Sequence, residues 1–166
     1  IQAPAGYPVP KVKLLPTFYF GQGDVREAVV DSTPIIRRLE AEYDGRSVLP
    51  EDDFLAFLDL LIEDFADEWM TKAMFHYRWH YAEDAANAGP LLIFWQSPTY
   101  PDDVARQMAD GFVKRQIDRL YVVGSNDVTA PIIEASVIRL LGILDRIVSR
   151  TGFVLGTRPS AADFAI

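Results

Sequence analysis

The sequence predicts an α+β chain that is mostly helical, in which a β-hairpin and one helix precede a helical bundle. β-Forming residues dominate up to Val30, and a helix-start signal follows them at residues 31–34. Beyond Pro50 the apolar residues recur with the 3.6-residue period of amphipathic helices. We therefore expect one domain over residues 1–46 and an all-helical domain over residues 47–166.

The first domain should begin with two strands. Residues 12–20 are rich in β-forming side chains, and Pro16 suggests an edge position or a bulge. The glycines of residues 21–24 provide turn chemistry, and residues 25–30 supply the second strand. Two strands alone are marginally stable in water, so further structure should pack against them.

A helix should follow the hairpin directly. Asp31 and Ser32 carry the small oxygen-bearing side chains that cap helices, and Pro34 suits the first turn. Ile35, Ile36, Leu39 and Tyr43 continue at helical spacing, and Asp44-Gly45 should end the helix.

Three long helices are expected after Pro50. The first should run from 51 to about 85 and end at Gly89-Pro90, and the second should cover about 101–123. The third should start near Thr129 and close at Gly152. The apolar stripe of the first helix consists of Phe54, Leu58, Leu61, Phe65, Trp69 and Met70.

The composition argues against several classes of partner. The net charge of −8 argues against binding along a nucleic-acid phosphate backbone and against docking on anionic membranes. The chain has no cysteine, which excludes disulfides and cysteine-ligated metal and fits a cytoplasmic location. No apolar run reaches the ~20 residues that cross a bilayer, and the first residues lack the pattern of a signal peptide.

Two short motifs of the first domain are candidates for a binding site, and a third motif near the end of the sequence is structural. Val9-Pro10 before the first strand and Asp31-Ser32 at a helix start form a candidate site for a small anionic peptide. A cis bond at Pro10 would expose the Val9 backbone, and the helix start would bind a carboxylate. The alternative is an ordinary turn proline and an ordinary helix cap. Ser160 and Asp163 form a capping box, whose role is to start a buried helix.

These motifs, in this order and spacing, resemble the glutathione S-transferase superfamily. The resemblance rests on Val9-Pro10, Asp31-Ser32, a linker ending in Val48-Leu49-Pro50, and Gly-x-x-Pro-Ser-x-Ala-Asp at residues 156–163. It implies the C-terminal part of a thioredoxin-like domain followed by a transferase-type helical domain. It also implies that Val9 and cis-Pro10 contact the cysteinyl part of glutathione, that Asp31 and Ser32 hold its γ-glutamyl end, and that the catalytic Tyr, Ser or Cys precedes residue 1.

The long helix carries two further candidate groups. Trp69, Met70, Met74 and Tyr77 could line a hydrophobic substrate pocket, which the family places against this helix, although such a stripe is also typical of a core or a dimer interface. His76 and His80 have the i, i+4 spacing of a metal clamp, but neither has a glutamate three residues before it. We therefore expect two partly exposed histidines and no metal. The acidic residues Asp59, Glu63, Asp64, Asp67 and Glu68 are predicted to form a solvated face.

The leading hypothesis is a protein that binds glutathione and uses its thiol to conjugate or reduce a small hydrophobic electrophile. The alternative is a non-catalytic module of the same fold, used for binding or assembly. The wide apolar stripe of the long helix predicts a homodimer.

Overall fold

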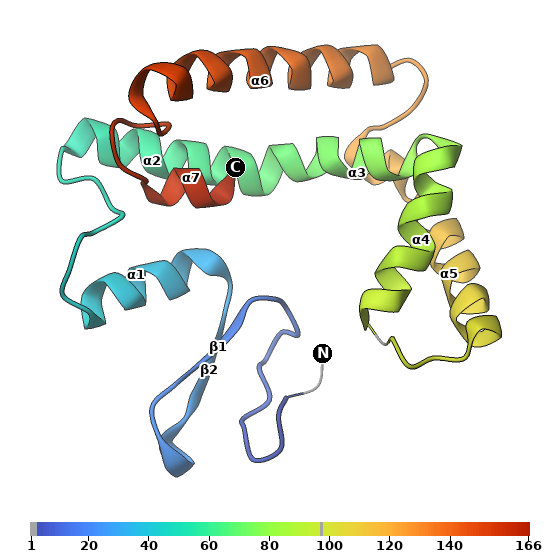
Figure 1. Cartoon of the computed structure of the whole chain (residues 1–166), viewed down its shortest axis with the longest axis horizontal. Helices are drawn as coiled ribbons and strands as arrows, with labels where there is room; N and C mark the ends of the chain where they lie inside the picture. Colours follow the sequence, from blue (N-terminus) through green and yellow to red (C-terminus); the bar gives the residue numbers. More distant parts are fainter. Residues whose placement is uncertain (1–2, 97) are drawn as a thin grey trace. The chain divides into compact units, whose positions relative to one another are not determined.

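The protein divides into two compact units, Ile1–Ala56 and Phe57–Ile166. The structure is a computed structural model that describes residues 3–96 and 98–166, without the side chains of Asp24 and Gln96. Its elements are mostly helices, with one two-stranded antiparallel sheet (Figure 1), which confirms the α+β prediction. The division between the two units falls inside the helix that contains Ala56.

The first unit is a β-hairpin followed by a helix. Strand β1 (Thr17–Phe20) pairs antiparallel with β2 (Glu27–Val30), with Thr17 opposite Val30 and a 3-10 turn, η1 (Gly23–Val25), between them. The strand begins later than residue 12 because Pro16 cannot donate to the ladder. Helix α1 (Ser32–Glu42) follows, close to its predicted ends.

Arg38 joins the helix of the first unit to both strands. Its guanidinium binds Glu27 of β2 at 2.6 Å and lies 4.0 Å from the ring centroid of Phe20 on β1. It also pairs with Glu42 one turn along α1 at 2.7 Å. Phe20 and Ile35 are both buried. The contacts of Arg38 hold the second half of α1 against the start of β2 and the end of β1.

The second unit contains the remaining helices. They are α2 (Asp53–Phe65), the π-helical turn η2 (Ala66–Met70), α3 (Thr71–Trp79), α4 (Ala82–Gln96), α5 (Asp102–Ile117), the 3-10 turn η3 (Leu120–Val123), α6 (Ala130–Thr151) and α7 (Ala161–Ala165). α4 and α5 lie side by side, and α3 packs on α4, α6 and η3 (Figure 1). Trp79 is buried, with its ring edge-on to Phe112 of α5 at 5.7 Å. No helix of the described residues is long and apolar enough to cross a membrane.

The first long helix differs from its prediction. Helical backbone runs from Asp53 to Trp79 and stops before residue 82, where α4 begins. Pro90 lies inside α4 and does not end it. At this point α4 packs so closely on α5 that a Cβ at Gly89 would lie 2.3 Å from a methyl carbon of Val113. These tertiary contacts stabilise the helical backbone on both sides of Pro90.

Helix α6 begins and ends where the sequence indicates, but its start is held differently. Thr129 occupies the N-cap position without a capping hydrogen bond from its side chain. Instead, the Asn126 side chain accepts from the N–H groups of Val128 and Thr129 at 2.9 and 3.1 Å. Gly152 ends the helix with φ of 89°, a conformation that favours glycine.

Candidate functional site

At the start of α1, one backbone N–H and one hydroxyl are open, meaning that no described residue accepts a hydrogen bond from them. Asp31 is the N-cap: its Oδ1 accepts from the N–H of Thr33 at 3.2 Å, and its carbonyl accepts from Ile35 at 3.4 Å. Pro34 has no N–H. Neither the N–H nor the hydroxyl of Ser32 has a partner among the residues that the structure describes. Ser32 therefore offers two donors at the positive end of an 11-residue helix.

Asp31 holds this helix start in an unusual backbone conformation. Its φ is 81° and its ψ is 134°, a region that residues with a side chain rarely occupy. Such conformations cost about 1–3 kcal/mol and cluster at ligand clamps and active sites. The strain lies next to the open donors of Ser32. The start of α1 is thus the strongest candidate site in the first unit.

The hairpin brings a second backbone segment to this point. Because Thr17 pairs with Val30, the residues just before β1 and just after β2 adjoin the same end of the ladder. These residues are Leu15-Pro16 and Asp31-Ser32. Thr17 closes the turn that leads into β1, since its hydroxyl donates to the carbonyl of Leu14 at 2.6 Å.

The prediction of a cis bond between Val9 and Pro10 is wrong. The cis bond found among the described residues is Leu15–Pro16, and the Val9–Pro10 bond is not cis. Pro10 is buried and Val9 is 68% exposed, but both lie upstream of a bent segment and not next to the strand. The run of β-forming residues predicts a strand from residue 12, whereas the ladder begins only after Pro16.

The predicted hydrophobic pocket residues separate into two groups. Met74 and Tyr77 line a groove of about 360 Å³ between α3 and α4, together with Leu91, Leu92 and Trp95. Arg78 also lines it and makes no ion pair within the described part of the chain.

Trp69 and Met70 lie elsewhere, in the π-helical turn. Neither of them lines the groove. Trp69 is 61% exposed, with the ammonium of Lys72 4.1 Å from its ring centroid.

His76 is completely buried, which corrects the expectation of two partly exposed histidines. Its Nδ1 lies 2.8 Å from the hydroxyl of Ser125. Its Nε2 lies 3.6 Å from Glu134 of α6 and has no hydrogen-bond partner among the described residues. Glu134 also accepts from the hydroxyl of Tyr81, and this bond raises the pKa of Tyr81. Burial and then the charge of Glu134 raise the pKa of Tyr77.

This Ser–His–Glu series is not arranged for nucleophilic catalysis. Ser125 is only 4% exposed, so a substrate cannot reach its hydroxyl. The network instead ties α3 to the start of α6 through buried polar groups.

The two histidines do not point at a common ligand position. Their rings are stacked, with centroids 4.7 Å apart and planes inclined by 26°. In-plane lone pairs of stacked rings run side by side, whereas a metal clamp needs them to converge. His80 lies 3.7 Å from Asp127. Within residues 3–96 and 98–166, no group of three or more His, Cys, Asp or Glu side chains is placed to hold a metal ion.

The predicted solvated acidic face is wrong at two positions. Asp59 is 1% exposed and Glu63 is 8% exposed. Asp59 Oδ1 accepts from the N–H of Ala162, in the first turn of α7, at 2.9 Å. A carboxylate fits there because the helix start supplies donors and a positive dipole end. The spacing to Ala162 is too long for any local pattern in the sequence to reveal this contact.

The capping box at Ser160 and Asp163 completes the start of α7. Asp163 accepts from the N–H of Ser160 at 2.9 Å with one oxygen and from the N–H of Val154 at 2.8 Å with the other. Ser160, Ala161 and Ala162 are all buried. This helix start is closed to ligands.

Comparisons with known proteins do not assign the chain to a family. Scans against protein families, curated proteins and solved structures found no match.

Proposed function

We propose that the protein binds glutathione at the start of α1 and presents its thiol to a small hydrophobic electrophile. The observation that supports this most is the open donor pair of Ser32 next to the strained N-cap Asp31. The γ-glutamyl carboxylate would accept from the Ser32 N–H and hydroxyl, where the helix dipole favours a negative charge. The superfamily resemblance of the Asp31-Ser32 motif supports the same assignment.

The cysteinyl part of glutathione would lie along the segment before β1. Leu15 lies in this segment, two residues before Thr17, the first residue of β1. Because Thr17 pairs with Val30, Leu15 adjoins the same end of the ladder as the start of α1. Leu15 is 75% exposed. We therefore assign the backbone contact that the resemblance implied for Val9 to Leu15, in the manner of an added strand.

The chemistry would be that of an activated thiol. The thiol of bound glutathione loses its proton to solvent, and the thiolate attacks an electrophilic carbon, so that a C–S bond forms while the bond to a leaving group breaks and that group departs with the electron pair. In the reductive alternative, an oxidised substrate gains two electrons while the bound glutathione and a second glutathione from solution are oxidised to their disulfide. No residue of this chain is assigned as the catalytic residue that stabilises the thiolate. The site residues described here orient the peptide.

The groove at Met74 and Tyr77 supports an apolar second substrate. Its wall of Leu91, Leu92 and Trp95 is apolar, and its volume of about 360 Å³ suits a small molecule. Flexible methionine adapts to ligands of different shape.

Titration with glutathione tests the proposal. We expect saturable heat by isothermal titration calorimetry at micromolar to millimolar glutathione. Ser32→Ala should weaken binding about 10- to 100-fold, because it removes one hydrogen bond to a charged acceptor. Ser136→Ala is the matched control, since Ser136 is an exposed helical serine of α6 whose hydroxyl donates to the carbonyl of Ile132 at 2.8 Å.

Three results separate the possibilities. If the wild-type chain does not bind at millimolar glutathione, the proposal fails. If Ser32→Ala binds as tightly as wild type, glutathione binds somewhere other than α1. If glutathione binds but a thiol-conjugation assay with the longest available form of the protein gives no product, the non-catalytic binding module is the better description.

We also propose that the protein forms a homodimer through the exposed apolar face of α2 and η2. Leu61, Phe65 and Trp69 are 50%, 40% and 61% exposed, which is unusual for large apolar side chains on one helical run. A monomer in multi-angle light scattering at micromolar concentration would contradict this proposal.

A further inference from the structure

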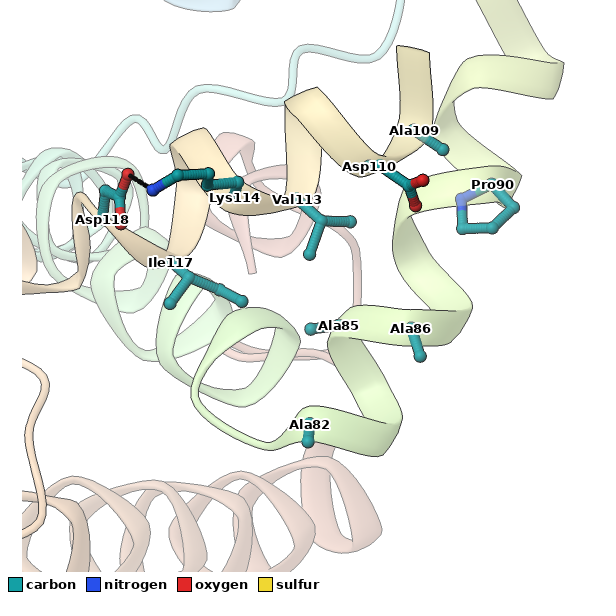
Figure 2. Close-up of a pocket in the computed structure, with 10 residues that line it drawn as sticks. All are labelled: Ala82, Ala85, Ala86, Pro90, Ala109, Asp110, Val113, Lys114, Ile117 and Asp118. Atoms are coloured by element: carbon teal, nitrogen blue, oxygen red, sulfur yellow. Dashed lines mark hydrogen bonds and ion pairs between the residues drawn. The ribbon is translucent and has the colours of Figure 1, made fainter. Parts of the chain in front are cut away.

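A cavity of about 510 Å³ lies between α4 and α5 in the second unit. We call it the α4–α5 groove. Ala82, Ala86 and Pro90 line it from α4, and Val113 and Ile117 line it from α5 (Figure 2). Ala85 and Ala109 are almost completely buried and also face it. Binding sites for small molecules commonly have this volume and an apolar lining.

The packing of the two helices explains why the groove is there. At Gly89 the helices touch so closely that even a Cβ would collide with Val113. The first half of α4 has only alanine side chains on the groove side, at Ala82, Ala85 and Ala86. Small side chains on one wall leave room beneath the longer Val113 and Ile117 (Figure 2). The small residues that let α4 and α5 pack closely thus also leave this space unfilled.

The charged side chains of the groove determine which charge an apolar ligand should carry. Lys114 and Asp118 neutralise one another at 2.8 Å (Figure 2). Asp110 makes no hydrogen bond or ion pair with any described residue, and its side chain lines the groove (Figure 2). The groove therefore has an apolar body and one unpaired negative charge.

We propose that the α4–α5 groove binds a small apolar molecule that carries one ammonium group. The hydrocarbon part lies on Ala82, Ala86, Val113 and Ile117, and the ammonium pairs with Asp110. This site is independent of the glutathione site at α1. The net charge of −8 also favours a cationic ligand over an anionic one.

Three probes with the same apolar body test the choice of charge. They are 4-phenylbutylamine, 4-phenylbutanol and 4-phenylbutyrate, titrated into the full chain and followed by amide NMR shifts. We expect saturable shifts at Ala82, Ala86 and Val113, with dissociation constants on the order of millimolar or below for the amine. The amine should bind tightest and the carboxylate weakest.

Two variants with matched controls test the place. Ala86→Leu should fill the groove and weaken amine binding at least about tenfold, because it removes space for the ligand body. Ala135→Leu on α6 is the control, since Ala135 is also an exposed helical alanine. Asp110→Asn should weaken the amine about two- to fivefold and leave the alcohol unchanged. Asp103→Asn, on the same helix outside the groove, should change neither.

Several results would overturn the proposal. These are equal binding of the amine and the alcohol, tightest binding of the carboxylate, no saturable binding, or an amine affinity that Ala86→Leu or Asp110→Asn leaves unchanged. Circular dichroism of each variant verifies that the fold is retained. If Ala86→Leu does not fold, Ala82→Leu gives the same test at the other exposed alanine of the groove.

Discussion

Helices α1 and α7 both begin with a small oxygen-bearing residue and an acidic residue, yet their starts differ in accessibility. At α7, the N–H groups of Ser160, Ala162 and Asp163 all have acceptors within the protein. At α1, the N–H and hydroxyl of Ser32 are open and Asp31 is exposed. Burial therefore decides the role of the same local chemistry: a closed start stabilises the fold, and an open start can hold a ligand.

The largest effect is expected at Asp59. Asp59→Ala leaves the buried N–H of Ala162 without an acceptor and should lower the free energy of unfolding of the second unit by about 3 kcal/mol. All 3 tryptophans lie in the second unit, so denaturant unfolding followed by tryptophan fluorescence reports on it. Asp64→Ala, at an exposed position of the same helix, is the control and should stay within about 0.5 kcal/mol of wild type. Equal effects at both positions would contradict the closed start of α7.

Asp163→Ala should have the next largest effect. It removes the acceptor of two backbone N–H groups, those of Ser160 and Val154, and should cost about 2 kcal/mol in the same assay. Its glutathione affinity should equal that of wild type, in contrast to Ser32→Ala. A variant with unchanged stability but lost glutathione binding would reverse the roles of the two helix starts.

Two substitutions at Asp31 distinguish the contribution of its capping hydrogen bond from the cost of its positive φ. Asp31→Ala loses the side-chain cap and keeps the φ of 81°, whereas glycine adopts this φ without strain and is itself a fair N-cap. Asp31→Gly should therefore be about 1–2 kcal/mol more stable than Asp31→Ala. Hydrogen exchange of the α1 amides measures this difference in the first unit. Equal protection in the two variants would show that the backbone at Asp31 is not strained.

The smallest effect is expected from pH at the α3–α6 network. The hydrogen bond to Glu134 raises the pKa of Tyr81 in the folded state above its value of about 10 in the unfolded chain. The fold thus favours the neutral phenol, and this contribution to stability is complete below pH ~10 and lost as pH rises through the folded pKa. Tyr81→Phe should flatten the fall in stability above pH ~10, whereas Tyr121→Phe, at a 78% exposed position, should leave it unchanged. An identical alkaline profile for Tyr81→Phe and wild type would argue against the Tyr81–Glu134 bond.

The sequence by itself determined the features that depend on neighbours along the chain. The start of α1 at Asp31-Ser32, the end of α6 at Gly152 and the capping box at Ser160 are set within about one helical turn. Local hydrogen bonds and backbone preferences are sufficient to specify them.

Only the tertiary structure decided which groups are buried. Asp59 belongs to an acidic run in the sequence, but it is buried because its carboxylate accepts a hydrogen bond from the N–H of Ala162, which lies far along the chain. His76 is buried because Ser125 and Glu134 come together around it, and Pro90 stays inside α4 because the helix packs on α5. The open donors of Ser32 have the same origin, since no described residue accepts a hydrogen bond from them. Periodicity carries no information about contacts between residues distant in sequence, and those contacts fix both the buried polar groups and the open ones.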